Sequence, residues 1–138
     1  MIEITVDLPF PPSVNQIWRV GRGRISGKRT VYRSPEYLDW VREADMSVMA
    51  QRQYPKRKIT GPFEAHVILS RRHGRGDLDN RASKAVLDWA QSRDLIRNDS
   101  DCRRLIAEWG DAEHGCRLTL REVETCSTST SNMIAPSR

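Results

Sequence analysis

Residues 63–92 read FEAHVILSRRHGRGDLDNRASKAVLDWAQS and combine a strand pattern, a basic turn, an acidic motif and a helix pattern. The first eight residues, 63–70, form an apolar run after Gly-Pro, which predicts a buried strand. A helix is expected to begin at Asp79 or Asn80 and to end near Ser92. The positions expected to face the core from this helix are Ala82, Val86 and Trp89.

Upstream, residues 2–8 (IEITVDL) alternate apolar and polar side chains and are rich in β-branched residues, which predicts a strand. Ser34-Pro35-Glu36 is a helix start, with a capping serine, proline at the first helical position and an acid in the first turn. This helix is expected to run to about Gln53. Its expected core face consists of Tyr37, Val41, Ala44 and Val48.

Downstream, residues 102–109 and 116–123 have strand patterns and are separated by a glycine-containing turn. The predicted element order is β-α-β-α-β-β. This order indicates one α+β domain, residues 1–123, with a mixed sheet of about four to five strands and two main helices. Residues 124–138 are rich in Ser and Thr and are predicted to be a disordered tail.

Composition excludes several classes of protein. The 138 residues fit one domain, and no apolar stretch is long enough for a membrane span. The N-terminal sequence lacks the basic and apolar regions of a signal peptide, so we expect a cytoplasmic protein. Three cysteines are too few for a disulfide-based secreted fold.

The net charge of +5, from 23 Lys and Arg against 18 Asp and Glu, is concentrated in three basic stretches. Residues 19–33 contain no acid, residues 56–58 read KRK, and residues 71–75 lead directly into the acidic motif. Basic loops of this kind favour contact with a nucleic-acid backbone. The candidate DNA contacts are Arg22, Arg24, Lys28, Arg29, Arg71, Arg72 and Arg75.

Asp77 and Asp79 lie two residues apart, so in an extended segment both carboxylates point to the same side. Two close carboxylates repel each other unless a proton or cation lies between them. Oxygen ligands beside basic loops suit Mg²⁺ or Mn²⁺, which combine a few protein carboxylates with phosphate oxygens. The alternative is that Asp79 only caps the helix.

Asn80, Lys84 and Asp88 recur every four residues and share a helix face if the helix is regular. Lys84 could neutralise charge on a phosphate, or it could form a surface ion pair with Asp88. The turn before the next strand adds Asp99 and Asp101, either of which could supply a third carboxylate.

Three segments together, LPFPPSVNQIWR (8–19), GDLDN (76–80) with SKAVLDWAQ (83–91), and NDSDCRR (98–104), resemble the RusA-type Holliday junction resolvases. The likeness extends from about Ile4 to Val123. These resolvases are small endodeoxyribonucleases of bacteria and their prophages. The resemblance implies a RusA-like fold and a homodimer that binds four-way junction DNA and hydrolyses two symmetric phosphodiester bonds with Mg²⁺ or Mn²⁺.

By position, the resemblance assigns metal binding to Asp77, Asp79 and Asp99 and a catalytic role to Lys84, with Asn80 as the accompanying asparagine. Two positions depart from the expected pattern. The interval from Asn80 to Lys84 has one residue more than expected, and Asp99 and Asp101 stand where adjacent acids are common. Asp99 is the first choice for the third acid and Asp101 the second.

The sequence thus predicts a Mg²⁺-dependent endodeoxyribonuclease that resolves Holliday junctions in recombination and repair. A non-catalytic nucleic-acid-binding module, in which the acids only cap a helix and line a loop, stays open as an alternative. A small Mg²⁺-dependent nucleotide phosphohydrolase is a third interpretation, but it gives the long basic loop no role.

Overall fold

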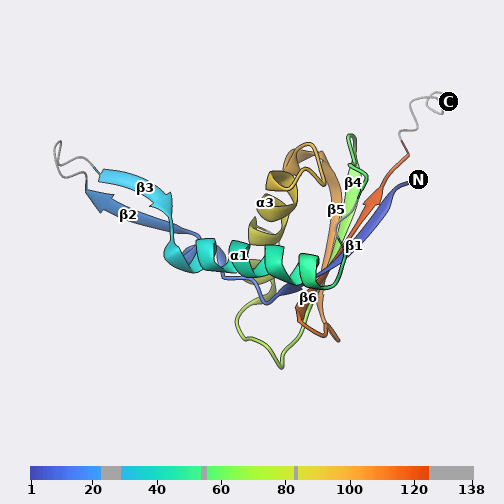
Figure 1. Cartoon of the computed structure of the whole chain (residues 1–138). Coiled ribbons are helices and arrows are strands. Elements are labelled where there is room, and N and C mark those ends of the chain that lie inside the picture. The colour runs from blue at the N-terminus through green and yellow to red at the C-terminus, as the bar shows by residue number, and fades with distance from the viewer. Residues whose placement is uncertain (23–28, 54–55, 83, 125–138) are drawn as a thin grey trace, which may run out of the picture.

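The computed structural model describes every residue except 23–28, 54–55, 83 and 125–138. It confirms the predicted α+β class, with a mixed four-stranded sheet and a separate two-stranded sheet (Figure 1). Most of the predicted tail lies outside the described residues. The elements in chain order are β1 (Glu3–Pro9), η1 (Val14–Gln16), β2 (Trp18–Arg22), β3 (Arg29–Arg33), α1 (Pro35–Ala50), β4 (Phe63–Leu69), α2 (Leu78–Ala82), α3 (Lys84–Ser92), η2 (Asp99–Asp101), β5 (Cys102–Trp109) and β6 (Gly115–Glu122).

The main sheet has the strand order β1-β6-β4-β5, in which only β4 and β5 are parallel. The buried strand predicted at residues 63–70 is present as β4: alternate side chains from Phe63 to Leu69 are buried, and those between them are half-buried. Helices α1 and α3 lie on the same side of this sheet (Figure 1). The opposite face carries polar pairs such as Arg121 with Glu3.

Helix α1 begins where the sequence predicts, because the Ser34 hydroxyl accepts a hydrogen bond from the Tyr37 amide at 3.1 Å. It ends at Ala50 rather than near Gln53, since the chain enters the left-handed region at Arg52 (φ 56°). Among the predicted core residues, Val41 is half-buried and the others are buried.

Side chains of α1 cover the outer edge of β1. Ser47 Oγ donates to the Asp7 carbonyl at 2.9 Å, and Trp40 Nε1 donates to the Pro9 carbonyl at 3.0 Å. Just after the helix, Gln53 Oε1 accepts from the Asp7 amide at 2.8 Å. Because these contacts satisfy backbone groups of an edge strand, they protect it from pairing with another chain.

One helix was predicted from Asp79 or Asn80 to Ser92, and the described residues on both sides of Ser83 are helical, as α2 and α3. Ser83 lies outside the described residues, within the interval that carries one residue more than expected. The predicted core positions of this segment, Ala82, Val86 and Trp89, are all buried.

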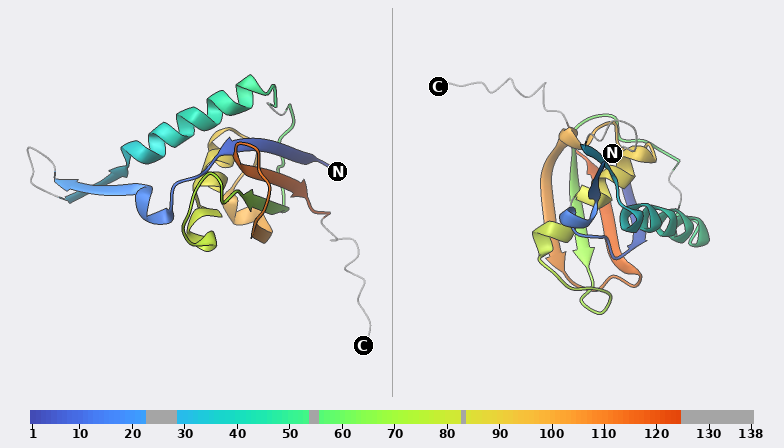
Figure 2. Two further views of the ribbon diagram at one scale, coloured as in Figure 1. Left: turned by 90° about the horizontal axis from the view of Figure 1, so that it is seen from below. Right: turned by 90° about the vertical axis from the view of Figure 1, so that its left-hand side faces the viewer.

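The basic stretch 19–33 contributes to an antiparallel hairpin, β2–β3, in which Val20 lies opposite Val31. The hairpin projects away from the main sheet beyond the start of α1 (Figures 1 and 2). Its apolar side chains at Val20 and Val31 are exposed by 54% and 65%. In the described part of the chain, no helix is both long and apolar enough to cross a membrane.

Candidate active site and nucleic-acid face

The GDLDN motif places its two aspartates at the beginning of α2. Asp77 directly precedes this helix, and Asp79 lies in its first turn. Leu78 packs against the core while both carboxylates are exposed. The extended segment expected around the two aspartates is not present, because Leu78 and Asp79 already belong to α2. Gly76 has φ +117°, and a Cβ there would lie 2.9 Å from Arg81 Nε, so this turn favours glycine.

Arg81 anchors α2 to the segment that follows β1. Its Nη1 donates to the Pro11 carbonyl at 3.2 Å, and its guanidinium lies 5.4 Å from the centre of the Phe10 ring. Sequence reasoning missed this anchor because the partners are 70 residues apart. The contact fixes the helix that carries Asp79 and the half-buried Asn80.

Lys84, the first residue of α3, lies between two carboxylates. Its Nζ is 3.2 Å from Asp88 Oδ1 and 3.8 Å from Asp99 Oδ2. The backbone of Asp99 is fixed to α3, because the Asp99 amide donates a hydrogen bond to Gln91 Oε1 at 3.0 Å. The structure therefore brings the predicted catalytic lysine together with the first-choice third acid.

Asp101, the second choice, faces a different partner. Both of its carboxylate oxygens accept hydrogen bonds from Arg97 at 3.1 Å. Because this bidentate pair already neutralises Asp101, Asp99 is the acid of η2 that is directed toward Lys84.

Asp77 and Asp79 have no ion-pair or hydrogen-bond partner among the described residues. Within the same residues, no three His, Cys, Asp or Glu side chains lie close enough together to hold a metal ion. The parallel register of β4 and β5 accounts in part for the separation of these acids. Cys102, which follows η2, pairs with Phe63 at the start of β4. Asp99 therefore lies near the opposite end of β4 from the turn that leads to Asp77.

Asp88 also contacts the base of the hairpin. Its Oδ2 lies 3.6 Å from Arg33 Nη1 at the end of β3. The Arg33 guanidinium stacks over two rings, at 4.4 Å from the centre of Trp18 and 4.7 Å from that of Tyr37. The sequence predicted only the pair with Lys84, because no local spacing relates Arg33 to Asp88.

Two other titratable side chains border this cluster. Burial raises the pKa of the Tyr37 hydroxyl, and the Asp88 carboxylate adds to this effect while Arg33 opposes it. Burial likewise raises the pKa of the Cys102 thiol, with a smaller contribution from Asp99. Both side chains therefore stay neutral at pH 7, which makes Cys102 a poor nucleophile.

The candidate DNA contacts fall into two groups. Arg71, Arg72 and Arg75 follow β4 and are exposed, and the Arg71 guanidinium lies 4.0 Å from the centre of the Trp109 ring. Arg22 and Arg29 end β2 and begin β3, respectively. Arg24 and Lys28 lie outside the described residues.

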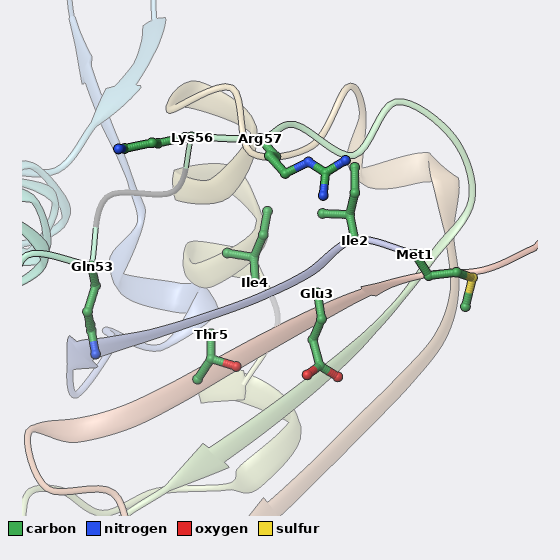
Figure 3. A pocket seen from close by; sticks show the side chains of 8 residues that line it. All are labelled: Met1, Ile2, Glu3, Ile4, Thr5, Gln53, Lys56 and Arg57. Carbon is green, nitrogen blue, oxygen red and sulfur yellow. The ribbon is translucent and has the colours of Figure 1, made fainter.

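The third basic segment, 56–58, lies elsewhere. Lys56 and Arg57 line a pocket of 490 Å³ beside the first half of β1 (Figure 3). No predicted catalytic residue lines this pocket, so we assign it no part in the candidate active site.

A search of curated proteins gave no match to the chain. A scan against protein-family models matched residues 9–121 to the family described as Endodeoxyribonuclease RusA. The matched segment covers the hairpin, the acidic motif, Lys84 and both acids of η2. The chain therefore belongs to the RusA endodeoxyribonuclease family.

Proposed function

We propose that this protein is a metal-dependent endodeoxyribonuclease that resolves four-way DNA junctions by paired phosphodiester hydrolysis. Membership of the RusA family supports nuclease activity on branched DNA in general. The observation that carries the site assignment is the position of the Lys84 ammonium beside Asp99, on the helix segment that follows Asp79. We place this activity in recombination and repair, in the bacterial cytoplasm.

Asp77 and Asp79 fit the chemistry of a Mg²⁺ or Mn²⁺ site, because they are exposed carboxylates whose charge no described side chain neutralises. We propose that these two residues hold the metal, and that Asp99, which lies near the other end of β4, acts on Lys84 instead of serving as a third metal ligand. A bound Mg²⁺ would supply Lewis acidity and lower the pKa of a coordinated water. Phosphate oxygens of the DNA would supply further ligands, as is usual for Mg²⁺.

Lys84 contributes a positive charge that the protein holds in place. With carboxylates on two sides, its ammonium can donate to a phosphate oxygen whose negative charge increases during hydrolysis. A nearby cation of this kind stabilises the transition state more than the ground state, which is the requirement for catalysis.

The exposed arginines of the 71–75 turn and the basic residues of the hairpin would bind the DNA backbone. Their charge attracts phosphate without regard to sequence, which suits an enzyme that recognises a branch by its shape. A homodimer would present two active sites related by a twofold axis, and this symmetry matches paired cuts in a four-way junction.

Cleavage of a labelled synthetic junction, with a linear duplex of the same sequence beside it, tests the proposal. We expect the wild type to cut the junction with Mg²⁺ or Mn²⁺ but not with EDTA. Asp77→Asn and Asp79→Asn should still bind the junction and should cut it at least about 100-fold more slowly. Asp94→Asn is the matched control, since Asp94 is an exposed acid that pairs with Lys58.

Two outcomes of this assay would contradict the proposal. Junction binding without cleavage under any metal condition would favour the non-catalytic binding module. Equal cleavage by the wild type and both Asn variants would overturn the assignment of Asp77 and Asp79. Inhibition of cleavage by free nucleotides, followed by their hydrolysis, would instead favour a phosphohydrolase.

A further inference from the structure

We infer that Asp88 is a positioning residue, which holds the Lys84 ammonium beside Asp99 and connects it through Arg33 to the base of the β2–β3 hairpin. The inference rests on the proposed function, because it takes Lys84 to be the side chain that meets the DNA phosphate. Its structural part concerns only the contacts among these four residues.

Asp88 lies largely buried between two cations. Its side chain is only 12% exposed, and each oxygen faces a different cation: Oδ1 faces Lys84 and Oδ2 faces Arg33. A carboxylate withdrawn from water needs such compensation. Oδ2 itself is buried and accepts no hydrogen bond from the described residues, so Arg33 compensates it by charge alone at 3.6 Å.

The Lys84 side chain is held in place by two carboxylates. A lysine side chain that is 44% exposed ordinarily samples many rotamers. Here two carboxylates from different elements hold it, with the nearer contact, 3.2 Å, coming from Asp88. Without Asp88, only the 3.8 Å contact with Asp99 would hold the ammonium, so its average position would change.

The hairpin is connected to Asp88 through Arg33. Arg33 ends β3 and is fixed by stacking over Trp18 of β2 and Tyr37 of α1. A displacement of the hairpin therefore acts on Arg33 and through it on Asp88. If Arg33 moved slightly closer to Asp88, its guanidinium would come within hydrogen-bonding distance of Oδ2. DNA bound by the basic hairpin is thus coupled to the lysine of the candidate active site.

The kinetic test compares Asp88→Asn, Asp88→Glu, Arg33→Gln and the double variant Asp88→Asn/Arg33→Gln. We expect Asp88→Asn to lower kcat about tenfold with the junction Kd unchanged, and Asp88→Glu to restore part of the loss. The double variant should be no slower than Asp88→Asn alone, because Arg33 acts through Asp88. Glu36→Gln is the matched control, since it breaks the Arg19–Glu36 pair, which also links the hairpin to α1.

A second measurement does not depend on activity. The chain has four lysines, so ¹³C-lysine labelling gives few side-chain signals, and Lys84→Met assigns the signal of Lys84. We expect the Lys84 Cε signal to shift in Asp88→Asn and in Arg33→Gln but not in Glu36→Gln. If Asp88→Asn does not fold, Arg33→Gln carries the same comparison.

The outcomes separate the inference from the proposed function. A Lys84 signal unchanged in both variants would overturn the inference, whether or not the protein cuts DNA. The inference would also be overturned if Asp88→Asn kept the wild-type kcat while cleavage still required Lys84. That outcome would leave the proposed function intact. A wild type that cuts no junction, with the expected signal shifts, would refute the function while supporting the positioning of Lys84.

Discussion

At the scale of single residues, the two acids of η2 differ in the cation that each one faces. Asp99 contributes to holding the lysine, whereas Asp101 is neutralised by Arg97 in a bidentate pair. A carboxylate already paired in this way has less to offer a metal ion or a catalytic lysine. The two acids of η2 thus have separate roles, one in the candidate active site and one in the stability of the turn.

We predict that Asp99→Asn lowers the rate of junction cleavage about 100-fold, because it removes a carboxylate that faces Lys84. Asp101→Asn should change the rate by less than about threefold, since it breaks only the pair with Arg97. Single-turnover cleavage at saturating enzyme measures both rates. The reverse order of effects would reassign the third acid to Asp101.

Sequence reasoning found the residues of the candidate site but not all of their contacts. Asp77, Asp79 and Lys84 could be chosen because two-residue and four-residue spacings relate them to local geometry. The contacts of Asp88 with Arg33, and of Arg81 with Pro11, join residues distant in sequence and depend on tertiary packing. No periodicity within a helix indicates such contacts.

At the scale of secondary-structure elements, Asp45 joins α1 to the end of α3. Its Oδ1 accepts hydrogen bonds from Trp89 Nε1 at 2.9 Å and from Arg93 Nε at 2.6 Å. Burial alone would raise the pKa of Asp45, but these hydrogen bonds outweigh burial and hold the pKa below its usual range. The ionised form is therefore favoured in the folded protein.

We predict that Asp45→Asn lowers the free energy of unfolding by about 1–2 kcal/mol at pH 7, because the charged partner of Arg93 is lost. Asp45 has a lower pKa in the folded than in the unfolded state, so its contribution is complete above about pH 5. The contribution of Asp45 is lost as the pH falls below about 4. The free energies of unfolding of the wild type and the variant should then become more similar. Urea unfolding at several pH values measures this difference.

The control is Asp39→Asn, which breaks an exposed pair with Arg42 on the same helix and should cost less than about 0.5 kcal/mol. If the free energies of unfolding of the wild type and Asp45→Asn differed more below pH 4 than at pH 7, the direction of the pKa shift would be contradicted.

Gly115 begins β6 with φ +117°, and a Cβ there would lie 2.7 Å from the Phe10 amide nitrogen. We predict that Gly115→Ala lowers the free energy of unfolding by about 1–3 kcal/mol, because the backbone of Phe10 or β6 must shift. Gly61→Ala has open space at its Cβ and should change stability by less than about 1 kcal/mol. Thermal unfolding compares the two, and equal Tm values would contradict the prediction.

Most elements followed from local sequence pattern. The Ser-Pro-Glu start, the apolar run that predicted β4 and the apolar positions of α3 each depend on a short-range rule that the structure confirms. The described residues on both sides of Ser83 are helical, in line with the one helix predicted there. Local sequence patterns do not predict the pairing of β4 with both β5 and β6, because the strand order depends on the packing of the whole sheet.

At the scale of the whole molecule, basic residues lie both on the projecting hairpin and in the turn after β4 (Figure 1). Two separate basic regions suit a branched substrate, which can offer different arms to each region. DNA affinity that depends on these charges must fall as salt concentration rises, because bound DNA releases counterions.

We predict that Arg72→Gln/Arg75→Gln weakens junction binding and lowers the slope of log K against log salt by about 1 to 2. The control is Arg121→Gln, because Arg121 pairs with Glu3 on the sheet face opposite the helices. Fluorescence anisotropy at several salt concentrations, with EDTA present, gives the slopes. An unchanged slope in the double variant would exclude these two arginines as phosphate contacts.

We propose that Asp77, Asp79 and Lys84 support paired cleavage of a four-way junction. The most direct measurement uses a supercoiled plasmid that extrudes a cruciform, since two coordinated cuts give linear DNA and one cut gives a nicked circle. With Mg²⁺, we predict linear product from the wild type and intact plasmid from Asp79→Asn. Nicked circles alone from the wild type, or linear product from Asp79→Asn at the wild-type rate, would contradict the account.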